Sequence, residues 1–210
     1  MNTRFPAVLA ASLAVLLVGS LPAAVAEPKS KSKSTCVKKG SKTVVKSRDA
    51  RVFTATVRDE DGSKATGLVG CLYSKGVKTV LATYGSEDAV VAGAVAHIRL
   101  AGRYVAYSTR TTASCKASCP PDVDANTYSV RAHDLQRRRR VRLLTTGEVS
   151  AVALTQRGGV AWLSGNQLLA ADGAGRRTLD TGTIAGSSLR AEVSIVSWAR
   201  DGVERFARLR

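Results

Sequence analysis

Residues 136–142 hold the densest group of potentially functional side chains in the chain. Five arginines fall within six positions, namely Arg137, Arg138, Arg139, Arg140 and Arg142. A guanidinium can donate two parallel hydrogen bonds to a phosphate or carboxylate, so this run predicts an anion-binding site. The same residues also suit a solvated hairpin turn, because Asp134 precedes them and Val141 resumes a strand pattern.

A second basic group lies near the N-terminus, in a Lys- and Ser-rich segment over residues 27–42. Its lysines include Lys29, Lys31 and Lys33, and residues 27–48 together account for nearly half of the net charge. Few aromatic residues accompany either basic run, and base stacking needs aromatic side chains. We therefore expect anionic cell-surface polymers or another envelope protein as partners, and no specific nucleic acid.

Four cysteines are present, and they allow three disulfide pairings. Cys115 and Cys119 are four residues apart in a turn-rich stretch, which favours a local bridge. That pairing leaves Cys36 to bond with Cys71. The two histidines stand at no metal-ligand spacing, so the sequence predicts no metal site, and it contains no cofactor motif.

An enzyme is the less favoured interpretation. No Gly-x-Ser-x-Gly nucleophile motif occurs, and His133 and Asp134 are adjacent in a predicted strand, where neighbours point to opposite faces. A hydrolase or lyase acting on envelope polymers would need an acidic cluster such as Asp122, Asp124 and Asp134. The first two also begin a calcium-loop pattern, but Thr127 stands where that pattern requires glycine.

Residues 1–26 have the pattern of a secretory signal peptide. Arg4 precedes an apolar run over residues 7–18, Pro22 follows it, and Ala24 and Ala26 occupy the positions that a signal peptidase recognises. A helix of twelve residues spans roughly 18 Å, short of the roughly 30 Å hydrocarbon core, which disfavours a membrane anchor. Cleavage after Ala26 lowers the net charge from +16 to +15. We expect a secreted or envelope protein without a transmembrane segment after cleavage.

Residues 43–210 form one predicted β domain. Short runs rich in Val, Thr, Leu and Ala alternate with Gly, Asp and Ser turns, and they group into four units. Units two to four share a Val-small-aromatic core, which begins at Val105, Val160 and Val196. The longest break in the pattern is an insertion at residues 110–127, clipped by the predicted Cys115–Cys119 bridge, where a recognition surface is often placed.

This pattern resembles the blades of TolB-like and WD-type β-propellers. The resemblance rests on the order strand, Gly turn, Val-small-aromatic strand, short third strand, Asp-Gly turn and fourth strand, over residues 43–208. It implies about four propeller-like, four-stranded antiparallel units, with an open arc of blades or a β-sandwich as alternatives. The diagnostic dipeptides of those families are missing, and their repeats more often number six to eight.

The fourth unit contains only three predicted strands, the first over residues 184–189. Residues 35–39 are a candidate for the missing outer strand, which would close the ring and give every edge a partner. From these observations we expect an exported, non-catalytic binding or scaffold protein that associates with anionic polymers.

Overall fold

The computed structural model describes residues 34–58, 62–84, 91–113 and 126–210. Within these ranges the protein is all-β, with fifteen strands and two short 3-10 helices. The strands form four separate antiparallel sheets in which strand order follows the sequence. No helix of the described residues is long and apolar enough to cross a membrane.

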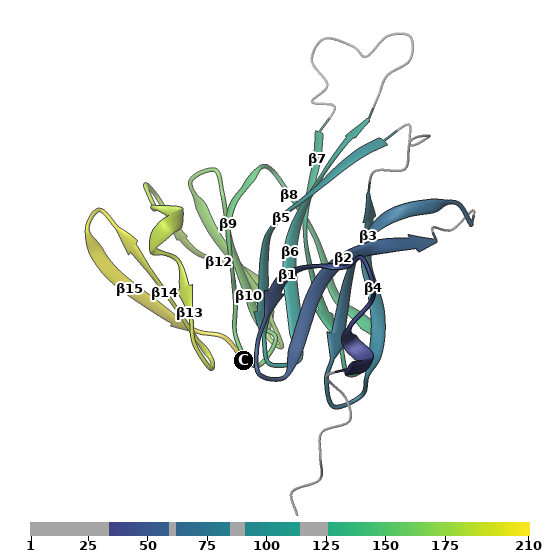
Figure 1. Ribbon diagram of the computed structural model, residues 1–210. Coiled ribbons are helices and arrows are strands. Elements are labelled where there is room, and N and C mark those ends of the chain that lie inside the picture. Colours follow the sequence, from purple (N-terminus) through teal and green to yellow (C-terminus); the bar gives the residue numbers. More distant parts are fainter. Residues whose placement is uncertain (1–33, 59–61, 85–90, 114–125) are drawn as a thin grey trace, which may run out of the picture.

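The four sheets succeed one another along the chain and fan out in sequence order (Figure 1). The first contains β1 (Lys42–Lys46), β2 (Ala50–Arg58), β3 (Lys64–Leu72) and β4 (Val77–Tyr84). The second contains β5 (Val91–Ala101), β6 (Tyr104–Ala113), β7 (Asn126–Asp134) and β8 (Arg139–Thr146). The third contains β9 (Val149–Leu154), β10 (Val160–Ser164), β11 (Gln167–Asp172) and β12 (Gly175–Thr181). The fourth contains β13 (Arg190–Ala191), β14 (Ile195–Arg200) and β15 (Val203–Arg208).

Strands β9, β10 and β11 of the third sheet are buried on both faces, which explains their continuous apolar runs. In β10, Val160 and Trp162 pack into the core shared with the second sheet, whereas Ala161 and Leu163 pack toward the fourth sheet. The three predicted Val-small-aromatic segments lie on β6, β10 and β14, the second strand of their sheets. Their valines and aromatic residues are all buried.

The outward face of the first sheet is covered by the N-terminal segment. Helix η1 (Ser34–Cys36) lies there, and the disulfide between Cys36 and Cys71 of β3 confirms the predicted pairing. Both cysteines are fully buried with Phe53, and Arg51 donates a hydrogen bond to the Cys36 carbonyl over 3.2 Å. Cys115 and Cys119 lie outside the described residues.

Two sequence predictions about the fourth sheet are wrong. Residues 35–39 form no strand, because the disulfide fixes Cys36 on the first sheet, so they cannot complete the fourth sheet and close a ring. Residues 184–189 are not a continuous strand either: Ile184 forms an isolated antiparallel bridge with Arg200, but helix η2 (Gly186–Ser188) follows at once. The Ser188 hydroxyl donates to the Ala185 carbonyl and accepts from the Ala199 amide, and these local bonds replace ladder bonds.

The predicted insertion is also shorter than the sequence pattern indicated. Strand β6 continues to Ala113 and β7 begins at Asn126, so both ends of the 110–127 segment belong to strands. Its central part, with Asp122 and Asp124, lies outside the described residues.

Candidate ligand-binding cavity

A cavity of about 620 Å³ lies where the four sheets converge. Each sheet contributes the end of its first strand or the turn that follows it. The lining comprises residues 47–49, 99–102, 152–154, Gln156 and 189–192. Because one connection from every sheet takes part, the cavity exists only when all four sheets are packed together.

Local hydrogen bonds and a β-bulge set the backbone conformation beside the charged residues that line the cavity. The Ser47 hydroxyl accepts the amides of Asp49 (3.2 Å) and Ala50 (3.1 Å), which tightens the β1–β2 turn and leaves Arg48 exposed. In β5 the left-handed backbone of His97 (φ 52°) marks a bulge between Ala96 and Arg99. Bulges redirect the side chains that follow them, and Arg99 lines the cavity.

The fourth sheet supplies the remaining charged residues. The Arg190 guanidinium donates hydrogen bonds to the Ser187 and Leu189 carbonyls, which holds it beside the cavity. The Gln156 amide donates to the Glu192 carbonyl over 3.4 Å and ties the third sheet to the fourth at this point.

The cavity combines an apolar lining with charged side chains. Buried Val152, Leu154 and Leu189 supply apolar surface. The charged groups are three guanidiniums and two carboxylates, from Arg48, Arg99, Arg190, Asp49 and Glu192. All five residues are exposed, and none of them forms an ion pair with any other residue that the structure describes. This arrangement suits a ligand with anionic groups that arginine can bind bidentately.

The predicted arginine run lies at the same end of the molecule as the cavity. Alternate turns of an antiparallel meander share one end, and the β5–β6 and β7–β8 turns are joined by a hydrogen bond from the Leu135 amide to the Arg103 carbonyl. Arg137 and Arg138 occupy the β7–β8 turn and are exposed, whereas Arg139, Arg140 and Arg142 belong to strand β8. The predicted turn is therefore present, but it contains only the first two arginines.

This end of the molecule carries exposed cationic residues from all four sheets, in turns or in the first strand of a sheet. We define the basic end by the residues Arg48, Lys75, Arg99, Arg137, Arg138, Arg157 and Arg190, all exposed. Asp49 and Glu192 are the acidic residues of the cavity. Lys29, Lys31 and Lys33 lie outside the described residues.

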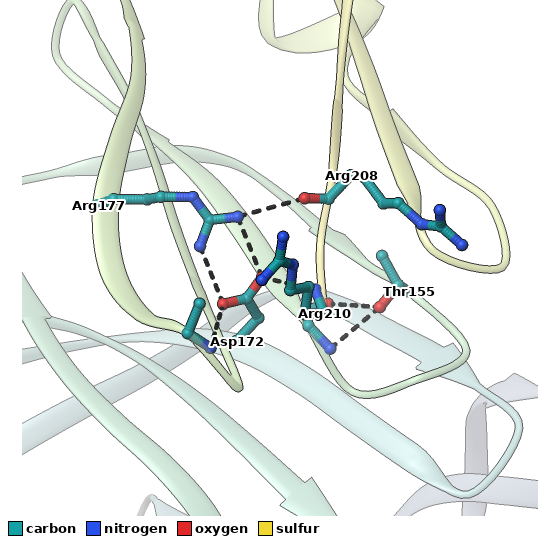
Figure 2. A network of polar contacts seen from close by, with 7 residues as sticks. Thr155, Asp172, Arg177, Arg208 and Arg210 are labelled. Carbon is teal, nitrogen blue, oxygen red and sulfur yellow. Dashed lines mark hydrogen bonds and ion pairs between the residues drawn. The ribbon is translucent and has the colours of Figure 1, made fainter.

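The buried aspartates are engaged in structural bonds. Asp134 accepts the amides of Gln136 (2.9 Å) and Arg137 (3.3 Å) and pairs with Arg103 (3.2 Å). Figure 2 shows Asp172 held in the same way by Arg177 and the Arg210 amide. The hydrogen bond from Arg177, opposed by burial and assisted by the backbone amides, lowers the pKa of Asp172 to about 2.

Asp180 links the third and fourth sheets. Burial alone would raise its pKa, but the hydrogen bonds from Trp198 and the Thr181 amide and the charges of Arg200 and Arg205 outweigh burial and lower it. The indole Nε1 of Trp198 lies 2.7 Å from the carboxylate. The recurrence of tryptophan in the sequence pattern thus reflects packing between sheets.

His133 and Asp134, which the sequence analysis weighed for catalysis, both form hydrogen bonds within the fold. Buried His133 is hydrogen-bonded to the Tyr107 hydroxyl over 3.0 Å, and that hydroxyl donates to the Leu81 carbonyl. Asp134, required by the hydrolase alternative, is occupied by its own turn and by Arg103. Among the residues that the structure describes, no group of three or more His, Cys, Asp or Glu side chains could hold a metal ion.

The cavity has no local signature in the sequence, because its lining residues come from four strand ends and turns spread over more than 140 positions. One signal was available: in a set of superposed units, the turns between first and second strands fall at the same place. Arg48 lies in the first of these turns, and Arg99 and Arg190 lie in the strands that lead into the corresponding turns of the second and fourth sheets. No protein-family model matches the chain, and no curated protein is detectably similar to it.

Proposed function

We propose that this is an exported, non-catalytic binding protein that holds an anionic polymer against its basic end. The observation that best supports this is the set of three exposed arginines, Arg48, Arg99 and Arg190, which three sheets contribute to one cavity. None of them forms an ion pair with a residue that the structure describes. Arg137 and Arg138 extend the cationic surface from the cavity along the second sheet. The separated charges suit a chain of repeated phosphate or carboxylate groups better than one small anion.

Export is the second element of this proposal. It is supported by the signal-peptide pattern over residues 1–26, and a disulfide between Cys36 and Cys71 is compatible with an oxidising compartment. The Lys-rich segment would add a flexible electrostatic contact to the same polymer. We also propose that the sheets are arranged radially, as in a propeller. The convergence of their first strands on one cavity supports this arrangement.

Binding to polyphosphate and to polygalacturonate, measured over a series of salt concentrations, tests the proposal. The cavity variant replaces Arg48, Arg99 and Arg190 with glutamine. The control variant replaces three exposed cationic residues at or toward the opposite end of the first and second sheets, Arg58, Lys64 and Arg110. Both variants lose three positive charges, so their net charges are equal.

We expect the cavity variant to bind at least one polymer about tenfold or more weakly than the control, with a shallower dependence on salt, because fewer counterions are released. Equal losses in the two variants would mean that net charge alone drives binding, and the cavity would have no special role. Binding of neither polymer by the unaltered protein would refute the proposal.

A further inference from the structure

The open edge of the fourth sheet offers a second surface, independent of the basic end. Strand β15 is the outermost strand of this sheet, and no described strand pairs with its outer edge (Figure 1). Phe206 on β15 is 78 % exposed, and Ile195 on the neighbouring strand is 42 % exposed. At the other end of the row of sheets, Cys36 and its disulfide cover the outward face of the first sheet. The first and fourth sheets therefore differ in how much apolar surface they expose.

The hydrogen-bond pattern of the β14–β15 hairpin shows which groups face the open edge. Asp201 (φ 53°) and Gly202 (φ 78°) form its two-residue turn, so Arg200 and Val203 face each other across the ladder. The Leu209 amide donates to the Ser194 carbonyl over 2.8 Å, which places hydrogen-bonded pairs at every second position from there. The amides and carbonyls of β15 residues 204, 206 and 208 therefore point away from β14.

The same three residues share the outward face of the sheet. Ala207 packs against the core between the third and fourth sheets, and side chains alternate along a strand. Glu204, Phe206 and Arg208 consequently project from the opposite face, and all three are exposed. The edge thus displays an acidic, an aromatic and a basic side chain in that order, each on a residue whose backbone is available for pairing.

We propose that β15 pairs antiparallel with β15 of a second copy of this chain. A two-fold axis through Phe206 sets it opposite its counterpart and sets Glu204 opposite Arg208 of the second copy, twice over. A shift of one residue would oppose an outward-facing residue to an inward-facing one. A shift of two residues in either direction loses both charge pairs. Charge complementarity and backbone orientation therefore select one register.

Two features of the outer edge of β15 affect the strength of the proposed dimer contact. The Arg208 carbonyl already accepts a hydrogen bond from Arg177 (3.3 Å), so pairing there uses its second lone pair or replaces that bond. An edge-to-edge contact of six residues buries little surface, which predicts a weak dimer. Because the paired strands run in opposite directions, the two basic ends would face opposite ways, and a dimer would bridge two polymer chains.

Cysteine cross-linking tests the register directly. In the proposed dimer the two Phe206 positions lie about 5.5 Å apart at Cα, within disulfide range. Phe206→Cys should therefore form a covalent dimer in a glutathione redox buffer. Val203→Cys is the matched control, because Val203 is also exposed (59 %) on β15 but would lie about 20 Å from its counterpart.

Charge reversal provides the second test, by sedimentation equilibrium up to about millimolar protein. Glu204→Arg and Arg208→Glu should each raise the dimer dissociation constant about tenfold or more, and the double variant should restore it. Cross-linking of Phe206→Cys no faster than of Val203→Cys, or a protein that stays monomeric throughout, would overturn the proposal. The charged residues of β15 would then serve only to prevent edge pairing.

Discussion

Replacing Asp172 with asparagine should destabilise the attachment of the fourth sheet to the third. Asp172 ends β11, and its carboxylate accepts two hydrogen bonds from Arg177 (2.9 and 3.0 Å), one from the Arg210 amide (2.7 Å) and one from the Ala174 amide (2.9 Å) (Figure 2). The residue is 1 % exposed. An asparagine keeps the shape but turns an amide NH₂ toward donors that need an acceptor.

The size of the effect follows from the pKa of Asp172. Its fall from 3.8 to about 2 means that folding favours the ionised carboxylate. At 1.36 kcal/mol for each tenfold change in the ionisation constant, this preference amounts to roughly 2 kcal/mol. Loss of hydrogen bonds to a charged group gives a similar figure, about 2–3 kcal/mol. We therefore expect Asp172→Asn to lose about 2 kcal/mol of unfolding free energy at pH 7.

The pH dependence has a definite sign. The pKa of Asp172 is lower in the folded state than in the unfolded state, so its contribution is complete above about pH 5 and disappears as the pH falls through about 2. The stability difference between the original protein and the variant should accordingly shrink over this range. Urea unfolding at pH 7, 4 and 2.5, followed by tryptophan fluorescence, measures the difference.

Asp201→Asn is the matched control. Asp201 is an exposed turn residue with a side chain 71 % accessible, its carboxylate lies 3.6 Å from Arg200, and asparagine tolerates its positive φ. We expect a change below about 0.5 kcal/mol at every pH for this variant. A loss at Asp172→Asn no larger than that of the control, or one that stays constant down to pH 2.5, would refute the assignment of the carboxylate as a charged anchor.

Two further predictions concern the first sheet. Replacing Cys36 and Cys71 together with alanine should lower the unfolding free energy by about 4 kcal/mol, because the bridge spans 35 positions; a loss under about 1 kcal/mol in urea unfolding would contradict this. Gly70→Ala would place its new Cβ 2.4 Å from Cδ2 of Leu135, at a cost of roughly 1–3 kcal/mol. In a double-mutant cycle Leu135→Ala should relieve this clash, whereas strictly additive losses would show that the two residues do not meet.

Local patterns in the chain were sufficient to predict most of the strands. Alternating and continuous apolar runs indicated the four-strand grouping of three sheets, and the spacing of Val-small-aromatic segments placed their second strands. These strand patterns depend on neighbours within a few positions, which is the information that residue periodicity provides. The pairing of Cys36 with Cys71 followed by elimination, from the expected local bridge between Cys115 and Cys119.

The errors arose where contacts distant in sequence decide the conformation. Residues 35–39 have a composition that a strand tolerates, but the disulfide to β3 fixes Cys36 against the first sheet. Residues 184–189 contain Ile184 and Leu189 in a strand-like run, yet Ser188 bonds locally and to Ala199. No pattern along the chain distinguishes these outcomes.

The sequence by itself determined the chain's β character, its strong positive charge and the exposed arginine turn, because each depends on residue types and short-range spacing. Only the tertiary structure decided that Arg48, Arg99 and Arg190 line one cavity and that Glu204, Phe206 and Arg208 face an open edge. The first required four sheets to converge, and the second required a hydrogen-bond register. Both depend on packing between segments far apart in the chain, which short-range patterns of residues do not reveal.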